Sequence, residues 1–476
     1  MTSDVGLRSA RGRILLAMMV SMALIAIDAT ILATAVPSIV RDLGSFSSFP
    51  WLFSIYMLAS AVTVPVYSKL ADTIGRKPLL LIGITLFLLG SVLAGLAWSM
   101  PVLIIARTVQ GLGAGAIAPM SMTVIGDIYT LEERARVQGY LASVWAIASV
   151  VGPTLGGLFA QFGFWRGIFW VNIPLGLAAA WLLVRNFHES IEKRRHRIDY
   201  AGAATLTGAM TLLMLGVLEG GHAWAWNSPA SLLVLGLGAA LLVAFVFIEL
   251  RAAEPVIPLG LLRRRIVSST TLLGLGVGMG LAGLTAFIPT YLEIGTGASP
   301  IVAGLALATF TIGWPLAAAT AGRLYLRWGF RTTATLGGVI VVVGATVLAF
   351  LGHSPSIVSV AVVCFFIGMG FGYAAVPSLV AVQSSVDWNE RGVVTGTNVF
   401  ARSLGQALGA AVLGAIANAI IANLGGDVHD PHVMIAASTA VFAGVAVIAV
   451  GILASALAMP RKVELVGIAG ESAVAN

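Results

Sequence analysis

Charge is scarce in this chain, and so is cysteine. Only 10% of the 476 residues are Asp, Glu, Lys or Arg, whereas soluble domains carry about a quarter. The single cysteine, Cys364, lies in an apolar run, which excludes a disulfide framework and a cysteine-based metal site. There is no phosphate-binding loop and no cluster of histidines or paired carboxylates. These absences argue against an ATP-driven pump and a membrane enzyme, and no cofactor or metal is expected.

Long apolar runs make up most of the chain. Hydrophobic residues make up 58% of the chain, so it is an integral membrane protein. Windows of about 20 apolar residues, the length that crosses a bilayer, predict an all-α membrane protein with fourteen transmembrane helices. An even number of spans places both termini on one side. The predicted spans run approximately over 13–38, 49–71, 78–98, 101–125, 140–162, 169–187, 199–219, 229–249, 267–292, 300–321, 332–352, 356–380, 394–421 and 432–458.

The basic residues predict which side of the membrane the termini face. Arg76, the run 193–197 and most other Arg and Lys residues fall in loops on the terminal side, whereas the opposite loops hold only Arg41 and Arg166. Since cytoplasmic loops carry the excess of Lys and Arg, we expect cytoplasmic termini in an inner (plasma) membrane. The net charge of +7 therefore comes from basic residues in the loops on the cytoplasmic side of the predicted spans. No nucleic-acid partner is expected, only membrane lipids around a monomer.

The chain also repeats itself at a constant offset. Residues 110–119 resemble 367–377, and Gly152 and Gly157 match Gly409 and Gly414. Matches at one shift across several spans indicate two six-helix halves, and halves with a site between them are a transporter design. The predicted domains are an N-terminal six-helix bundle at 1–198, an inserted two-helix hairpin at 199–250 and a C-terminal six-helix bundle at 251–476.

Two ionisable residues, Asp28 and Arg107, lie inside predicted spans. A charged group at the bilayer centre costs roughly 2.5–3.5 kcal/mol on insertion scales, so such residues are candidates for function. Burial disfavours a charged carboxylate, so Asp28 is a candidate proton carrier. The alternative is a carboxylate permanently paired with a structural cation or satisfied by hydroxyls such as that of Thr30. The guanidinium of Arg107 stays protonated. It either influences the protonation of a nearby carboxyl group or serves as a structural anchor between helices.

Four stretches carry a resemblance to a known family. Asp28–Pro37, Ser68–Lys77, Leu103–Gly111 and Gly139–Gly157 resemble, in order and context, motifs of the major facilitator superfamily and specifically its fourteen-span drug:proton antiporter branch. The resemblance covers nearly the whole chain and implies the major facilitator fold. The chain departs from the motifs at three positions, where Ser68, Thr73 and Ala148 replace a glycine, an arginine and a glycine.

The resemblance implies roles for the motif residues. Asp28 and Arg107 would couple transport to protons. The loop after the second span would form a conformational gate, unless it is a fixed staple; the gate residues are Asp72, Gly75, Arg76 and Asp127. The span-five motif is typical of exporters, although its small residues also suit close helix packing. Its members are Gly139, Gly152, Pro153, Gly156 and Gly157.

We therefore predict a proton-coupled antiporter that exports lipophilic or cationic small molecules, that is, multidrug efflux by alternating access. A dedicated transporter of one metabolite, lipid or siderophore is the alternative, and a non-transporting scaffold or sensor is a third possibility. Aromatic walls suit flat, lipophilic or cationic ligands, although such side chains also face lipid or pack. The candidate substrate-binding residues are Trp51, Tyr56, Trp145, Tyr291, Phe310, Trp314, Asn398 and Phe400.

Overall fold

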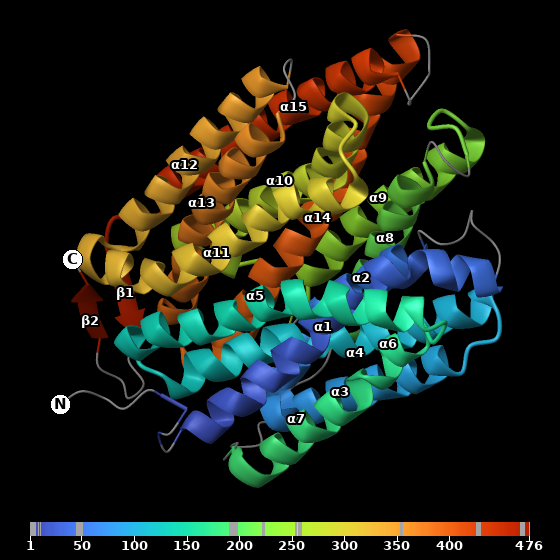
Figure 1. The fold of residues 1–476 in the computed structure, drawn as a ribbon. Coiled ribbons are helices and arrows are strands. Elements are labelled where there is room, and N and C mark those ends of the chain that lie inside the picture. Colours follow the sequence, from blue (N-terminus) through green and yellow to red (C-terminus); the bar gives the residue numbers. More distant parts are fainter. Residues whose placement is uncertain are drawn as a thin grey trace. The chain divides into compact units, whose positions relative to one another are not determined.

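The protein is almost wholly helical, as predicted (Figure 1). In the computed structural model, the described part of the chain contains only two strands, β1 (Val463–Val466) and β2 (Ser472–Ala475), which pair antiparallel. The model describes residues 6–7, 9, 11–43, 51–189, 199–220, 224–252, 255, 259–352, 356–424, 430–466 and 472–475. The helices are α1 (Gly12–Leu43), α2 (Trp51–Ile74), α3 (Arg76–Gly95), α4 (Met100–Ile128), α5 (Leu131–Gln161), α6 (Gly167–Trp170), α7 (Asn172–Asn186), α8 (Tyr200–Glu219), α9 (Pro229–Glu249), the 3-10 helix η2 (Leu261–Arg263), α10 (Arg265–Thr296), α11 (Pro300–Trp328), α12 (Phe330–Leu351), α13 (Ile357–Ser384), α14 (Trp388–Asn423) and α15 (Pro431–Ala458).

Thirteen helices in the described part of the chain are long and apolar enough to cross a membrane. Helices α6 and α7 together form one of these spans. The predicted span at 199–219 corresponds to α8, whose apolar portion, Ala201–Gly216, is shorter than the others. The predicted count of fourteen is therefore not confirmed. The basic run 193–197, on which part of the orientation prediction rests, lies outside the described residues.

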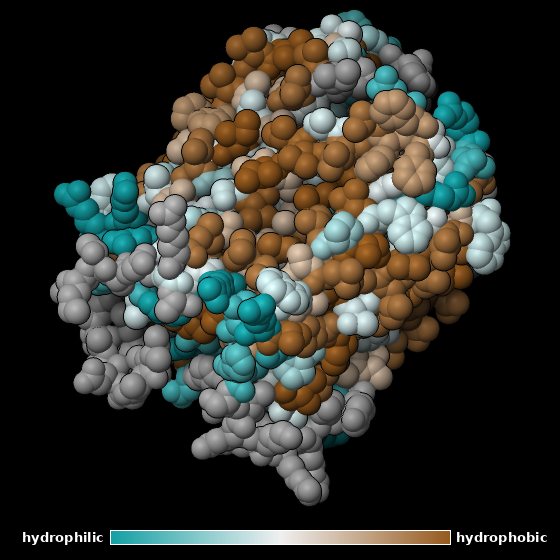
Figure 2. Space-filling model, turned by 60° about the horizontal axis from the view of Figure 1, so that its bottom comes forward, coloured by the Kyte–Doolittle hydropathy of each residue, from teal (hydrophilic) through white to brown (hydrophobic). Residues whose placement is uncertain are grey.

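Apolar side chains cover much of the molecular surface, as Figure 2 shows for one face. Phe350 in α12 is 76% exposed, and Val447 in α15 is 72% exposed. Such an apolar surface is a liability in water. It is the surface expected of helices that face lipid tails.

The helices form two compact units. The first consists of Met1–Leu259 with Asp387–Phe400, and the second of Gly260–Val386 with Ala401–Asn476. Within the first unit, α2 and α3 pack against α4, and α1 packs against α5 and α7. The α8–α9 hairpin also belongs to the first unit, where α8 contacts α2. Within the second unit, α11 and α12 pack against α13, and α10 packs against α15. The predicted domain limits stay predictions.

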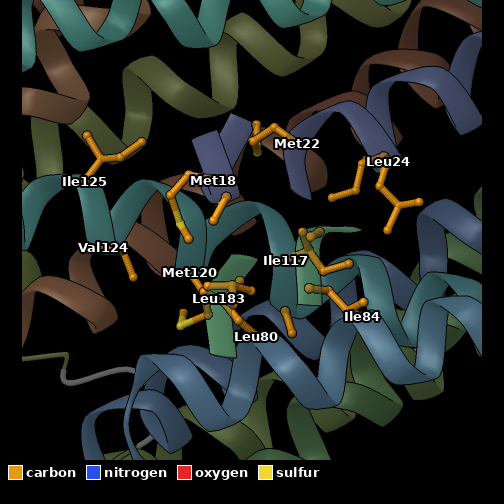
Figure 3. Packing of buried hydrophobic residues seen from close by; sticks show 14 of the residues in the cluster. Met18, Met22, Leu24, Leu80, Ile84, Ile117, Met120, Val124, Ile125 and Leu183 are labelled. Atoms are coloured by element: carbon orange, nitrogen blue, oxygen red, sulfur yellow. The ribbon is translucent and has the colours of Figure 1, made fainter. Parts of the chain in front are cut away.

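The core of the first unit is a layer of aliphatic and methionine side chains between α1, α3, α4 and α7 (Figure 3). Met18, Ile84, Met120 and Leu183 are fully buried or nearly so, one from each of these helices. Lipid tails are as apolar as leucine, so there is no hydrophobic force between helices within a bilayer. Close van der Waals contact holds this layer together instead, which makes the fit between the helices important.

Matched glycines make matched close approaches inside each unit. A Cβ atom on Gly111 would lie 2.5 Å from the Tyr56 carbonyl oxygen in α2, and one on Gly368 would lie 2.2 Å from the Phe310 carbonyl oxygen in α11. A side chain at either position would push two helices apart. Since both pairs occur at equivalent places in the sequence repeat, the two units are built on the same internal plan.

The turn before α3 recurs before α12. Gly75 has φ 98° and ψ 161°, and Gly329 has φ 85° and ψ 161°. Positive φ at these values strains any residue with a Cβ atom, so both turns require glycine. This requirement explains why the loop motif has a glycine at position 75.

A polar staple holds the C-terminal end of α1. Asp42 accepts hydrogen bonds from Trp165 Nε1 and from Arg166, each at 2.9 Å. Arg166 also donates to the carbonyl oxygen of Ala97 at 2.8 Å, which ties in the end of α3. The Trp165 indole and then the Arg166 guanidinium hold the pKa of the Asp42 carboxyl below its usual range. The staple therefore keeps its charge in mildly acidic surroundings.

The α1–α5 contact gives a test with an internal control. A Cβ atom on Gly152 would lie 1.9 Å from Thr30 Oγ1, whereas one on Gly157 would have no neighbour within 4 Å. We expect Gly152→Ala to destabilise the protein by about 1–3 kcal/mol through overpacking. Gly157→Ala leaves stability unchanged or slightly higher, because alanine is the better helix former. Thermal unfolding in detergent measures both. Equal effects of the two substitutions would show that the packing of α1 on α5 is not as described.

Candidate functional site

The two intramembrane charges of the first unit form a buried ion pair. Arg107 Nη1 in α4 lies 2.6 Å from Asp28 Oδ2 in α1, and each side chain is only 1% exposed. Arg107 Nε also donates to the Leu52 carbonyl oxygen in α2 at 3.1 Å. The structure therefore brings together the two residues that the sequence singled out separately. An ion pair in a low dielectric is strong only when further hydrogen bonds satisfy both partners.

Two amide side chains supply those hydrogen bonds to the carboxylate. Gln110 Nε2 and Asn172 Nδ2 donate to Asp28 Oδ1 at 2.9 and 3.0 Å. Both amides also reach Ser91 Oγ, at 2.9 and 3.2 Å, and this hydroxyl donates in turn to the Phe87 carbonyl oxygen. Five helices, α1 to α4 and α7, thus contribute to one polar cluster. Both oxygens of Asp28 have donors in the ionised form.

The sequence did not single out Asn172, and Gln110 appeared only as part of the motif stretch Leu103–Gly111. Gln110 lies three residues after Arg107 on α4, so the two share a face, and Arg107 Nη1 donates to Gln110 Oε1 at 2.8 Å. Asn172 is the first residue of α7, where the chain restarts after the short α6. Its signal in the sequence was an amide inside an apolar span, two residues before Pro174.

Polar atoms without a partner border the ion pair. The guanidinium carbon of Arg107 lies 4.2 Å from the ring centroid of Tyr56, a predicted substrate residue. Among the described residues, the Tyr56 hydroxyl and Asn172 Oδ1 are buried and have no hydrogen-bond partner. Buried polar atoms are rarely left unpaired. The cluster therefore has capacity for a further hydrogen-bonded group.

A second charged cluster surrounds the C-terminal end of α4. Arg76 Nε lies 3.2 Å from Asp127 Oδ2, and Arg391 Nη1 lies 3.6 Å from Asp127 Oδ1. Arg391 and Arg134 both donate to the Gly126 carbonyl oxygen. Cations at a helix C-terminus stabilise it, since they face the negative end of the helix dipole. The predicted gate residues Arg76 and Asp127 are thus in contact, and Arg391 joins them from the part of α14 that belongs to the first unit.

The other gate residues have different surroundings. Gly75 forms the tight turn before α3. Glu189 accepts hydrogen bonds from the backbone amides of Arg76 and Lys77 at 3.2 and 3.0 Å, so it satisfies donors at the start of α3. The side chain of Asp72 lies outside what the structure describes.

The span-five motif residues all lie on α5. Gly152 is buried against α1, where Thr30 Oγ1 bonds the Ala148 carbonyl oxygen at 3.0 Å. Gly156 is buried, Gly139 is half-buried and Gly157 is exposed; the side chain of Pro153 lies outside the described part.

The predicted substrate residues of the first unit differ in exposure. Trp145 is 41% exposed and Tyr56 is 7% exposed, while Trp51 and Asn398 are half-buried and Phe400 is buried. Tyr56 adjoins the Asp28–Arg107 pair. The others stay predictions.

In the second unit, two of the predicted residues form an aromatic group with Phe371. The ring centroids of Phe310 and Trp314 lie 6.0 Å apart, and each packs edge-on against Phe371. Tyr291 is fully buried, and its hydroxyl donates to the carbonyl oxygens of Leu351 and Gly352 at 3.0 and 3.1 Å. The Tyr291 side chain is therefore engaged in packing α10 against the end of α12.

These observations define a class: a polytopic helical membrane protein built from two related units, with a hydrogen-bonded ion pair inside one of them. The chain belongs to the Major Facilitator Superfamily, whose family model matches residues 18–410. It is therefore a membrane transporter for small molecules rather than an enzyme.

Relatives and solved structures agree with this assignment. The chain is 32% identical to Multidrug resistance protein 3 of Bacillus subtilis, over 86% of this chain and 80% of that protein. It is also 32% identical to Multidrug transporter protein MdtP of the same organism, over 90% of this chain and 80% of that protein. The crystal structure of the human organic anion transporter MFSD10 (TETRAN) has a TM-score of 0.65 at 14% identity, covering 92% of this chain and 99% of that one. This last likeness shows the fold alone.

Asparagines at the two ends of α7 give a matched test of the polar cluster. Asn172→Leu removes a donor from the buried carboxylate, so we expect a loss of roughly 1.5–3 kcal/mol of stability. Among the described residues, Asn186 donates only to the Leu182 carbonyl oxygen of its own helix. Asn186→Leu should therefore change stability by less than about 0.5 kcal/mol. Thermal unfolding of the purified variants in detergent measures the difference. A harmless Asn172→Leu would contradict the described hydrogen bonds.

Proposed function

We propose that this transporter is a proton-coupled antiporter that exports lipophilic or cationic small molecules by alternating access. The observation that carries the proposal is the buried Asp28–Arg107 pair, in which one partner can take up a proton and the other cannot. A protonatable carboxyl inside a membrane protein is the feature expected of proton relays. The family assignment supplies the transport context.

Protonation of Asp28 changes the cluster in a defined way. The ionised carboxylate accepts hydrogen bonds from Arg107, Gln110 and Asn172. A proton on Asp28 removes its negative charge and leaves Arg107 as an uncompensated buried cation, which favours rearrangement of the surrounding helices. We propose that proton uptake from outside and substrate binding from inside exclude each other. Substrate release outside then accompanies protonation of Asp28.

We propose that the charged cluster at the end of α4 is the cytoplasmic gate. The ion pairs of Asp127 with Arg76 and Arg391 are the contacts that would latch one state and release in the other. Asp72 and Gly75 belong to the same loop motif and would complete the gate. In this proposal the protein lies in the inner (plasma) membrane as a monomer among lipids, with both termini cytoplasmic.

The names of the relatives support a broad substrate range. Two are multidrug proteins of Bacillus subtilis, and another is described as "Efflux pump FUS6" of Gibberella moniliformis at 32% identity over 83% of this chain and 72% of that protein. A dedicated transporter of one metabolite, lipid or siderophore remains the second candidate.

Reconstituted transport tests the coupling. In proteoliposomes with an imposed pH gradient, the wild type should move a lipophilic cation such as ethidium against its concentration gradient. Asp28→Asn, which cannot ionise, should lower this uphill movement to the level of protein-free vesicles, and size-exclusion chromatography in detergent checks that the variant is folded. Glu219→Gln, an acid at the end of α8, is the control and should transport normally. Undiminished gradient-driven transport by Asp28→Asn would refute the coupling role.

Susceptibility of expressing cells separates the two candidate functions. A multidrug exporter should lower susceptibility to several chemically unrelated dyes and antibiotics at once, and Asp28→Asn should abolish this protection. Protection against a single compound would favour the dedicated transporter instead. The measurement is the inhibitory concentration of each compound, with protein amounts in the membrane matched between strains.

A further inference from the structure

Three charged residues lie seven or more residues from either end of their helix, within the helices that the structure describes: Asp28, Arg107 and Arg402. The first two neutralise each other. Arg402 is in α14, fourteen residues from its first residue and twenty-one from its last. It therefore lies about 16 Å along the helix from Arg391, which belongs to the gate cluster. Such a depth is out of reach of the membrane surface for most side chains.

Arg402 has no counter-ion among the described residues. No ion pair, side-chain hydrogen bond or ring contact involves it there. Helix α10 packs against this part of α14, since a Cβ atom on Gly278 would lie 2.0 Å from the Arg402 carbonyl oxygen. The one acidic residue of α10 is Glu293, fifteen residues beyond Gly278, which is about 22 Å along the helix.

The other spans of the second unit cannot neutralise Arg402 either. Helices α11, α12, α13 and α15, and α14 from Ala401 onward, contain no aspartate or glutamate at all. Their remaining charges are arginines near helix ends, such as Arg323 and Arg327. A guanidinium does not lose its proton in proteins. The unit therefore holds a permanent positive charge at membrane depth, and its described helices place no aspartate or glutamate near it.

Intramembrane charges face the interior of a bundle or a water-filled cavity rather than lipid, and they mark substrate pathways. The Arg402 side chain is half-buried, so a ligand can reach it. Gln406 follows one helical turn later and is also half-buried, which adds an amide donor on the same side of α14. Guanidinium with a neighbouring amide is a donor set suited to a carboxylate.

We propose that Arg402 binds a negatively charged group, a carboxylate in the first instance, of the transported compound. The inference rests on the proposed transport function and extends its substrate class from lipophilic and cationic molecules to organic acids and zwitterions. Asp28 is already paired with Arg107. In the described spans, the only mid-helix charge left for a ligand is therefore the positive charge of Arg402. The ligand supplies the counter-ion that the protein lacks.

Two dyes that differ only in this group test the proposal. Rhodamine B carries a free carboxylate, and its ethyl ester does not. Transport of each is measured in proteoliposomes with an imposed pH gradient. We expect Arg402→Gln to lower transport of the acid about tenfold, the loss of one charge-assisted contact, and to leave transport of the ester within about twofold. Arg402→Lys, which keeps the charge, should retain most transport of the acid.

Arg323→Gln removes an exposed arginine near the end of α11 and is the control; it should transport both dyes like the wild type. An equal loss of both dyes in Arg402→Gln, with restoration of neither in Arg402→Lys, would make Arg402 a structural residue. Gradient-driven transport of the ester but not of the acid by the wild type would also overturn the inference and leave the proposed antiport intact. If the gradient drives neither these dyes nor the ethidium of the coupling test, the proposed function itself fails.

Discussion

The burial of one ion pair constrains the whole first unit. Asp28 and Arg107 are almost completely removed from solvent, and removing one partner of such a pair leaves an uncompensated charge at a cost of about 3–5 kcal/mol. The amides of Gln110 and Asn172 are required because the carboxylate has more acceptor capacity than one guanidinium can fill. Helices α1, α4 and α7 must therefore approach closely at one level. Methionine and aliphatic side chains that pack on the N-terminal side of Asp28 along α1, together with close glycine contacts, make the approach possible.

The two units share a scaffold but differ in charge. The glycine approaches at Gly111 and Gly368 and the turns at Gly75 and Gly329 recur, whereas no described helix of the second unit contains an aspartate that could correspond to Asp28. The second unit instead holds Arg402 without an acid beside it. Backbone packing tolerates little change, since it depends on the absence of a Cβ atom at fixed points. Side chains that face the interior are freer to differ, so the halves of one fold can take separate tasks.

Much of the fold followed from the sequence because the bilayer imposes simple rules. Apolar length located thirteen of the spans, and the constant offset located the matched glycines. Asp28 and Arg107 stood out because a charge in an apolar run is costly. Asn172 did not, because its importance depends on a contact between α1 and α7, 144 residues apart, that no local pattern records. The approach of Arg391 to Asp127 was missed for the same reason. Asp72 and most of the substrate residues remain predictions.

The fixed charge of Arg107 has an electrical consequence. With Asp28 ionised the pair is neutral, and with Asp28 protonated it carries one positive charge, because the guanidinium cannot compensate by losing a proton. A site that alternates between these states moves one elementary charge whenever it carries a proton from one side to the other. Export of a neutral compound against one proton would then be electrogenic, so membrane voltage would contribute about 2.3 kcal/mol per 100 mV in addition to the difference in pH.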